Sequence, residues 1–225
     1  MENTGLSSKI LKELVPVLSA LPTTLAISLI AFSLGFCVGL PLAFVRVYSR
    51  KPFQILVDGY EKVFRGIPEI VLMMFFYYGL GSLPALSMFK NPFFSATFAL
   101  GLRSGAHQSQ IFRASIRGVG EEQTMAALSL GLTRMQAILY VILPQTFIVA
   151  TPGLASEYAL LVKDSSYCFI LGVVEMMRKA YTVMRLTLDP VFPFITAALL
   201  YILLTFPLAT YLDTWASRKK AQLGI

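Results

Sequence analysis

The sequence has little charge and few of the residues that carry out chemistry. Only 14% of its 225 residues are charged, whereas 56% are hydrophobic. A typical soluble domain has about 25% charged residues. One histidine and two cysteines occur in the whole chain. This shortage of charge indicates a protein that folds in lipid.

The motifs of common enzyme classes are also missing. No His-Glu-x-x-His or Gly-x-Ser-x-Gly pattern occurs, so the sequence lacks the motifs that supply metal ligands or a catalytic serine in these enzyme classes. No Gly-x-x-x-x-Gly-Lys-Ser/Thr loop is present to cradle the phosphates of ATP. Cys37 and Cys168 are single and far apart, and we interpret them as two small buried hydrophobic residues. We therefore expect no catalytic residue, no metal site and no bound cofactor.

Long uncharged runs are what the sequence has in abundance. A helix needs about 20 largely apolar residues to cross a bilayer, and its backbone must be satisfied within the segment. Four uncharged runs reach this length: Leu14–Val45, Ile70–Phe89, Met135–Ser156 and Val191–Leu212. A fifth segment, 91–119, begins apolar but carries several polar side chains.

These runs predict an all-α integral membrane protein with about five transmembrane helices. We expect spans near 21–46, 66–88, 92–117, 136–162 and 190–213, all within a single domain of residues 1–225. Residues 1–14 carry several charges, and the apolar run after them is too long for a cleaved signal, so we expect a retained first span.

The basic residues predict the orientation. The net charge of +7 comes largely from three groups that follow alternate spans, around residues 46–65, 113–134 and 218–220. By the positive-inside rule these groups are cytoplasmic, which puts the N-terminus outside and the C-terminus inside. In a membrane protein such an excess reports topology, so we expect no nucleic-acid partner.

Two short segments lie between the expected spans. In residues 52–65, Phe53 and Leu56 belong to an apolar face, and Asp58 and Glu61 lie off that face. This pattern predicts an amphipathic helix at the inner surface. Residues 120–131 predict a small cytoplasmic helix with Gly131 as its C-cap. Its apolar stripe suits docking into a groove on a partner.

The sequence from Met125 to Gln145 resembles the coupling motif of ABC import permeases. That motif has an EAA-type triplet, a glycine and an Ile-x-Leu-Pro ending. The triplet here begins with methionine where the family usually has glutamate. The matching residues are Gln123, Met125, Ala126, Ala127, Gly131, Val141, Leu143, Pro144 and Gln145.

Three further segments resemble the binding-protein-dependent branch that imports polar amino acids (histidine, glutamate, glutamine, arginine and opines). They are Phe64–Glu69, Gln110–Arg113 and Leu161–Ser166. The resemblance implies a MetI-like, type I importer permease in the cell membrane. Its implied partners are ABC ATPase subunits that use ATP and Mg²⁺, a second permease (a copy or a paralogue), an extracytoplasmic amino-acid-binding protein, and the lipid bilayer.

Ionisable groups at membrane depth are costly and are default functional candidates. An arginine at this depth is suited to a substrate carboxylate, since the two can form a bidentate pair. The alternative is structural: Arg103 pairs with an acid such as Glu157, and His107 makes one interhelical hydrogen bond. The candidate substrate contacts are Arg103, His107, Gln110, Glu157, Lys163, Asp164 and Glu69.

Two other classes of protein compete with the permease. An ion-gradient-driven secondary amino acid carrier normally has more spans, often as inverted repeats, and no repeat is visible here. A membrane enzyme is disfavoured because the sequence lacks the catalytic motifs described above. We therefore expect a pore subunit that moves polar amino acids by alternating access and is coupled to a separate ATPase through residues 121–144.

Overall fold

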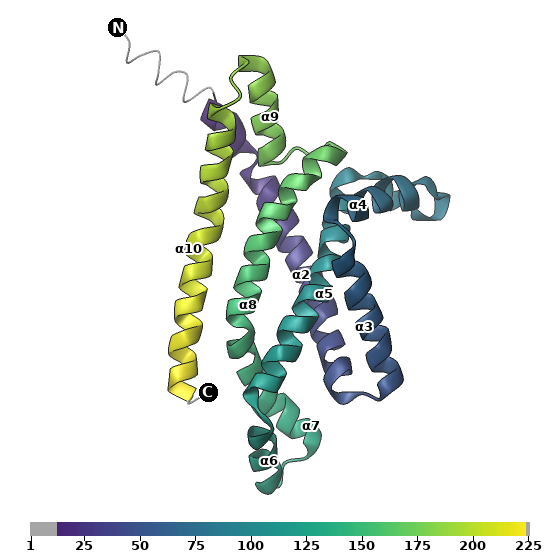
Figure 1. Ribbon diagram of the computed structural model, residues 1–225, viewed down its shortest axis with the longest axis vertical. Helices are drawn as coiled ribbons and strands as arrows, with labels where there is room; N and C mark the ends of the chain where they lie inside the picture. Colours follow the sequence, from purple (N-terminus) through teal and green to yellow (C-terminus); the bar gives the residue numbers. More distant parts are fainter. Residues whose placement is uncertain (1–12, 224–225) are drawn as a thin grey trace. The chain divides into compact units, whose positions relative to one another are not determined.

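The computed structural model describes residues 13–223, and every regular element in that range is a helix (Figure 1). The segment expected as the first span, 21–46, is helical, and the charged residues 1–12 before it lie outside the described residues. The elements are α2 (Leu21–Tyr48), α3 (Lys51–Gly66), α4 (Glu69–Met74), η1 (Phe75–Gly79), η2 (Leu80–Ser82), η3 (Pro84–Lys90), α5 (Pro92–Val119), α6 (Glu121–Ser129), α7 (Arg134–Ala137), η4 (Ile138–Ile142), α8 (Leu143–Asp164), η5 (Ser165–Leu171), α9 (Met176–Thr187) and α10 (Phe192–Leu223).

Within residues 13–223, three helical stretches are long and apolar enough to cross a membrane: Glu13–Tyr48, Arg134–Leu171 and Phe192–Gln222. A fourth is present if the bent pair Lys51–Gly66 and Glu69–Ser82 counts as one span. Helix α5 is outside this set because it carries three arginines and a histidine. Its 28 residues still give it a length of about 42 Å, which exceeds the hydrocarbon core of about 30 Å.

The segment expected as one span at 66–88 is broken into short pieces. The chain bends by 101° between the helical stretches Lys51–Gly66 and Glu69–Ser82. Pro68 explains this bend, because proline disfavours helical geometry in the residue before it, here Ile67. After α4 the chain forms a π turn and two 3-10 segments, and Pro84 starts the second of them. An uncharged run therefore did not mean a continuous α-helix.

The described chain packs into two compact units, which we treat separately. Of the described residues, the first comprises 13–33, Ile67–Gly101 and Tyr158–Phe206, and the second Leu34–Gly66, Leu102–Glu157 and 207–223. In the first unit, Val17, Met176 and Ala197 are among the residues of a buried cluster. A second feature of this unit is an aromatic group in which Phe76 and Phe89 lie 5.2 Å apart, centroid to centroid.

The start of α9 is fixed by polar groups of the first unit. Thr24 Oγ1 accepts a hydrogen bond from the Met176 N–H at 3.2 Å. The buried Glu175 carboxylate accepts from the N–H groups of Met177 (2.7 Å) and Arg178 (2.6 Å). It also accepts from the Tyr201 hydroxyl at 2.9 Å. The free N–H groups that a helix leaves at its start are thus satisfied.

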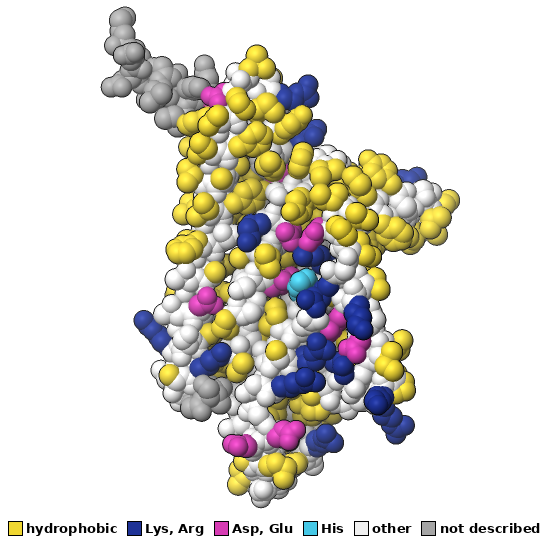
Figure 2. Space-filling model, in the orientation of Figure 1, with side chains coloured by type: hydrophobic (Ala, Val, Ile, Leu, Met, Phe, Trp, Pro, Cys, Tyr) yellow, Lys and Arg dark blue, Asp and Glu magenta, His cyan; other side chains and the backbone are white. Residues whose placement is uncertain are grey.

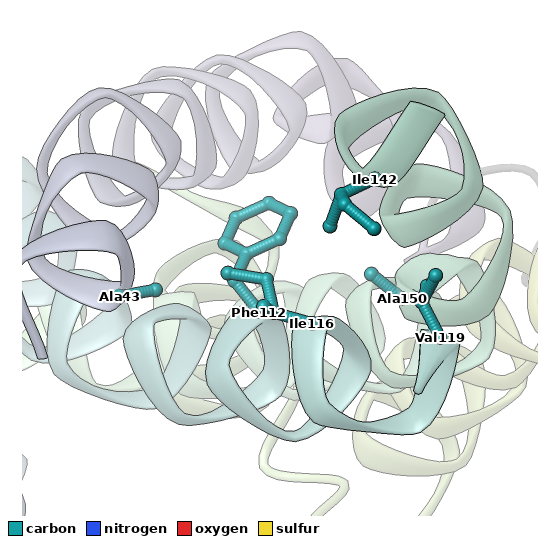
Figure 3. Packing of buried hydrophobic residues seen from close by; sticks show 6 residues of the cluster. All are labelled: Ala43, Phe112, Ile116, Val119, Ile142 and Ala150. Carbon is teal, nitrogen blue, oxygen red and sulfur yellow. The ribbon is translucent and has the colours of Figure 1, made fainter. Parts of the chain in front are cut away.

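The second unit has its own apolar core, in which Ala43 of α2 faces Phe112 of α5, and Ile142 and Ala150 complete the cluster (Figure 3). Phe112 is fully buried and packs edge-on against Phe36 at 5.4 Å and Phe147 at 6.1 Å. The core therefore joins α2, α5 and the η4–α8 segment.

Helices α2 and α5 approach closely through small residues. Gly35 and Gly39 are buried one turn apart on α2. A Cβ added at Gly39 would lie 2.8 Å from the Gly105 carbonyl oxygen and 2.9 Å from the Ser109 nitrogen. Such Gly-x-x-x-Gly spacing lets two helix backbones come together in a membrane protein. Cys37, expected to be buried, is exposed, since it lies off this packed face.

Candidate functional site

The loop between α5 and α8 is built rigidly at both of its turns. Helix α6 ends in a Schellman motif, in which Leu132 N–H bonds to the Ala127 carbonyl at 3.2 Å and Gly131 N–H to Leu128 at 3.0 Å. Gly131 has φ of 85°, which only glycine adopts without strain. Thr133 then caps α7 in a reciprocal capping box with Gln136. The predicted C-cap role of Gly131 is confirmed.

Helix α6 leaves apolar side chains uncovered. Met125 is 63% exposed and Leu128 39%, whereas Leu132, the third residue of the expected apolar stripe, is half-buried. Leu130, directly after the helix, is 84% exposed, and Ala127 is buried. Figure 1 shows α6 and α7 side by side at the end of the α5–α8 connection. On its other side α6 is tied to α8, because Gln145 Nε2 donates to Gln123 Oε1 at 3.4 Å. The exposed stripe has the chemistry of a docking surface.

The Leu143–Pro144 pair lies where a π turn meets an α-helix. Residues Ile138–Ile142 form the π turn η4, and α8 begins at Leu143. Proline at 144 has no N–H to donate, and in a regular α-helix its ring would press on the carbonyl of Tyr140. The wider π turn accommodates this ring, so the Leu-Pro end of the motif has a structural reason.

A buried polar network on α3 and α5 holds Gln110. Glu61 is only 3% exposed. Its carboxylate accepts hydrogen bonds from Ser109 at 2.8 Å and from Gln110 at 3.0 Å. It also pairs with the Arg113 guanidinium at 3.3 Å. This amide of Gln110 is therefore engaged by a protein carboxylate in the second unit.

The network continues through Asp58, which pairs with Arg46 at 2.6 Å and with Arg113 at 3.7 Å. The amphipathic pattern of this helix did not say which of its two faces meets protein. In the structure Phe53 is 56% exposed and Leu56 70%, whereas Glu61 is 3% exposed. Lipid, unlike water, accepts the apolar face, and the charges turn inward to partners.

The remaining candidates of the second unit are on α5 and α8. His107 Nδ1 lies 3.9 Å from Glu157 Oε2, and Glu157 is 2% exposed. This proximity agrees with the structural alternative of an interhelical contact for His107. Arg103 lies one turn before His107 on α5 and is half-buried.

The other three candidates belong to the first unit. Glu69 is the first residue of α4. Lys163 and Asp164 end α8, where the chain changes from α-helix to the 3-10 segment η5. Lys163 also lines a cavity of about 340 Å³, together with Ser166, Met177 and Tyr201.

This combination of all-helical spans and a capped, exposed loop defines a membrane transport component. The chain belongs to the family of binding-protein-dependent transport system inner membrane components, whose model matches residues 35–220. The family predicted from the motifs is thus confirmed, as is the location in a membrane. An ion-gradient-driven carrier is set aside by the same finding.

Individual relatives agree with this family. The chain is 32% identical over 203 residues to the arginine transport system permease protein ArtQ of Bacillus subtilis, covering 90% of this chain and 91% of the relative. It is 30% identical to the nopaline permease protein NocM of Agrobacterium fabrum, with 88% and 85% covered. The probable glutamine permease GlnM of Bacillus subtilis is 34% identical, with 83% and 85% covered.

Solved structures show the same fold. An amino acid ABC transporter crystallised with histidines matches with a TM-score of 0.81 and 29% identity, covering 93% of this chain and 97% of that one. A chain of the MetNI methionine ABC transporter in an inward-facing conformation matches with a TM-score of 0.79 and 16% identity, covering 90% and 95%. The expected MetI-like fold is therefore present.

Proposed function

We propose that this chain is the transmembrane pore subunit of an ATP-driven importer that moves polar amino acids into the cytoplasm. The observation that carries the proposal is α6: a capped helix with exposed Met125, Leu128 and Leu130, in a chain of this transport family. An apolar stripe of this kind needs a partner to cover it. A groove on an ATPase subunit is the partner that the coupling motif implies.

The proposed architecture is one permease domain over residues 1–225 with five crossings, α5 included. Its basic groups near residues 46–65, 113–134 and 218–220 support a cytoplasmic C-terminus and an N-terminus outside. Two such permeases, copies or paralogues, would form the pore and alternate its access. ATP and Mg²⁺ would be used by the ATPase subunits, and this chain would bind no cofactor.

The substrate class is inferred from relatives named for arginine, nopaline and glutamine. We propose a basic or amide-bearing amino acid, delivered by an extracytoplasmic binding protein. Arg103 is the proposed partner of its carboxylate. The other proposed contacts are His107, Gln110, Glu157, Lys163, Asp164 and Glu69, although Gln110 would first have to leave Glu61.

The first experiment tests coupling. Tagged protein, purified in mild detergent from membranes of its source cell, should bring with it an ATP-hydrolysing subunit identified by mass spectrometry. Ala126→Arg, on the exposed face of α6, should abolish this capture. Ala221→Arg, the same change at an exposed alanine of α10, is the matched control and should retain it. Equal capture by both variants would contradict docking through α6.

The second experiment tests the substrate. Proteoliposomes holding the complete importer should take up radiolabelled arginine or glutamine. Uptake should need ATP on the side of the membrane where the ATPase subunits lie and the binding protein on the opposite side. Arg103→Gln should lower uptake at least roughly tenfold, since one charge-assisted pair is worth about 1.5–3 kcal/mol. Uptake driven by a proton or sodium gradient without ATP would contradict the proposal.

A further inference from the structure

A cavity of about 550 Å³ lies in the second unit, lined by residues of α2, α5, α6 and the α7–η4 segment. Ile116 and Ile142, which are 5% and 1% exposed, form apolar parts of its wall. Thr124 and Leu128 of α6 line it from the coupling loop. Its volume falls within the range of about 300–1,000 Å³ found for small-ligand sites.

The charges around this cavity favour an anion. Arg117 and Arg134 line it with a single carboxylate, that of Glu121. In residues 13–223 neither guanidinium forms an ion pair or a side-chain hydrogen bond. Figure 2 shows dark-blue basic side chains gathered in the part of the surface above the α6–α7 loop. The cavity therefore keeps two cations available to a ligand.

The position of Arg134 adds to this argument. It is the first residue of α7, and the start of a helix favours anions over cations. Thr133, the residue before it, satisfies the helix start by its capping box, so the guanidinium serves no capping role. Local helix electrostatics thus give no reason for an arginine here, whereas an anion in the cavity would.

The apolar wall narrows the class of anion. Val47 and Tyr48, the last residues of the apolar stretch Glu13–Tyr48, also line the cavity. The end of a membrane-spanning helix is where hydrocarbon gives way to lipid headgroups, and tyrosine is enriched at that level. A ligand that suits this cavity carries a phosphate, which the two guanidinium groups can bind, next to methylene groups, which the apolar wall can contact.

We propose that this cavity binds the headgroup of an anionic phospholipid, with Arg117 and Arg134 holding the phosphate. Charge-assisted bonds from guanidinium to phosphate are strong and directional. Val47, Ile116 and Ile142 contact the adjoining methylene groups. Because Thr124 and Leu128 of α6 share the cavity, the bound lipid would also hold α6 against α2 and α5. The coupling loop would then depend on the lipid composition of the membrane.

Native mass spectrometry of the full chain in detergent tests this, using phosphatidylglycerol and phosphatidylcholine with the same acyl chains. Each interfacial arginine multiplies binding of anionic lipid by roughly five, so two give a preference of roughly 30-fold. Arg117→Gln with Arg134→Gln should abolish that preference. The matched control, Lys62→Gln with Arg65→Gln, removes two exposed charges of α3 outside the cavity and should keep it.

Two further variants separate the cavity from general surface charge and from misfolding. Thr124→Trp fills the cavity but keeps both arginines, and it should lose the preference as well. Arg117→Lys with Arg134→Lys keeps both charges and should retain the preference to within roughly fivefold. Retention by Thr124→Trp, or equal loss in the α3 control, overturns the proposal.

The same preparations distinguish a protein occupant. If the Arg117→Gln, Arg134→Gln variant keeps its phosphatidylglycerol preference but no longer captures the ATPase subunit, the cavity receives a partner's acidic side chain and the lipid proposal is overturned. If it loses the lipid preference while the exposed stripe of α6 still captures the ATPase, the lipid site stands independently of the proposed function.

Discussion

Replacing Gly39 with alanine should destabilise the second unit, and the structure allows the size of the effect to be worked out. The new methyl group would meet the Gly105 carbonyl oxygen at 2.8 Å, the Gln108 Cβ at 2.9 Å and the Ser109 nitrogen at 2.9 Å. Two of these three atoms belong to the α5 backbone, so no side-chain rotation relieves the clash. The helices must instead move apart by about half an ångström.

The expected net loss is about 2 kcal/mol, because two backbone contacts below 3 Å put the clash at about 3 kcal/mol and the better helix propensity of alanine returns about 1 kcal/mol. Overpacking of this kind costs about 1–3 kcal/mol, and a gap of about 0.5–1 Å forfeits a quarter to a half of each dispersion contact along the two helices. Against this, alanine has a helix propensity better than that of glycine by about 1 kcal/mol. Gly59 is the matched control: it is exposed on α3, and a Cβ added there would meet no atom within 4 Å. Gly59→Ala should therefore stabilise the protein by about 0.5–1 kcal/mol.

Thermal unfolding in detergent measures both variants. Trp215, the one tryptophan of the chain, reports on the second unit by its fluorescence. Cys168, which is fully buried, reports on the first unit by thiol labelling in a Cys37→Ser background. For a chain of this size, 1 kcal/mol moves Tm by about 2–4 °C, so Gly39→Ala should lower it by about 4–8 °C. A Tm at or above wild type, with Gly59→Ala behaving as expected, would refute the close approach of α2 and α5.

Buried and capping groups give three more predictions. Glu61→Ala should cost about 3 kcal/mol, seen as a lower Tm, because it leaves the charge of Arg113 poorly compensated, and Glu61→Gln should cost less. Burial raises the pKa of Glu175 from 4.5 to about 7, so the folded state binds its proton more tightly than the unfolded state. The contribution of Glu175 to stability should be complete below about pH 4.5 and fall by up to about 3 kcal/mol as the pH rises through 7, a slope that Glu175→Gln should remove. Thr133→Ala should cost about 1 kcal/mol through loss of the capping box with Gln136, measured as faster amide exchange at the start of α7; unchanged exchange there would argue against the cap.

The termini of α6 show what local sequence can specify. Gly131 was assigned as a C-cap from its position after an apolar helical stretch, and the Schellman hydrogen bonds and positive φ agree. Such a motif is decided by residues within one turn of each other. The same holds for the break at Pro68, whose effect on Ile67 is a property of neighbouring residues.

The faces of α3 show what the periodicity left open. The periodicity predicted a helix, and α3 is one, but it did not say which face meets protein. In water the apolar face of a helix is the packed one, but beside lipid either face can meet protein. Here Glu61 is buried against Ser109 and Gln110, residues 48 and 49 positions away in sequence, whereas Leu56 is exposed.

The sequence by itself determined that this chain is helical, that it belongs in a membrane and that α6 is a capped loop helix of a transport family. These properties depend on composition, on uncharged length and on motifs of adjacent residues. Only the tertiary structure decided which polar groups are paired, that Gly35 and Gly39 face α5, and that Arg117 and Arg134 share a cavity. Those facts depend on which helices meet and on how closely their backbones approach, and no pattern within a single helix contains that information.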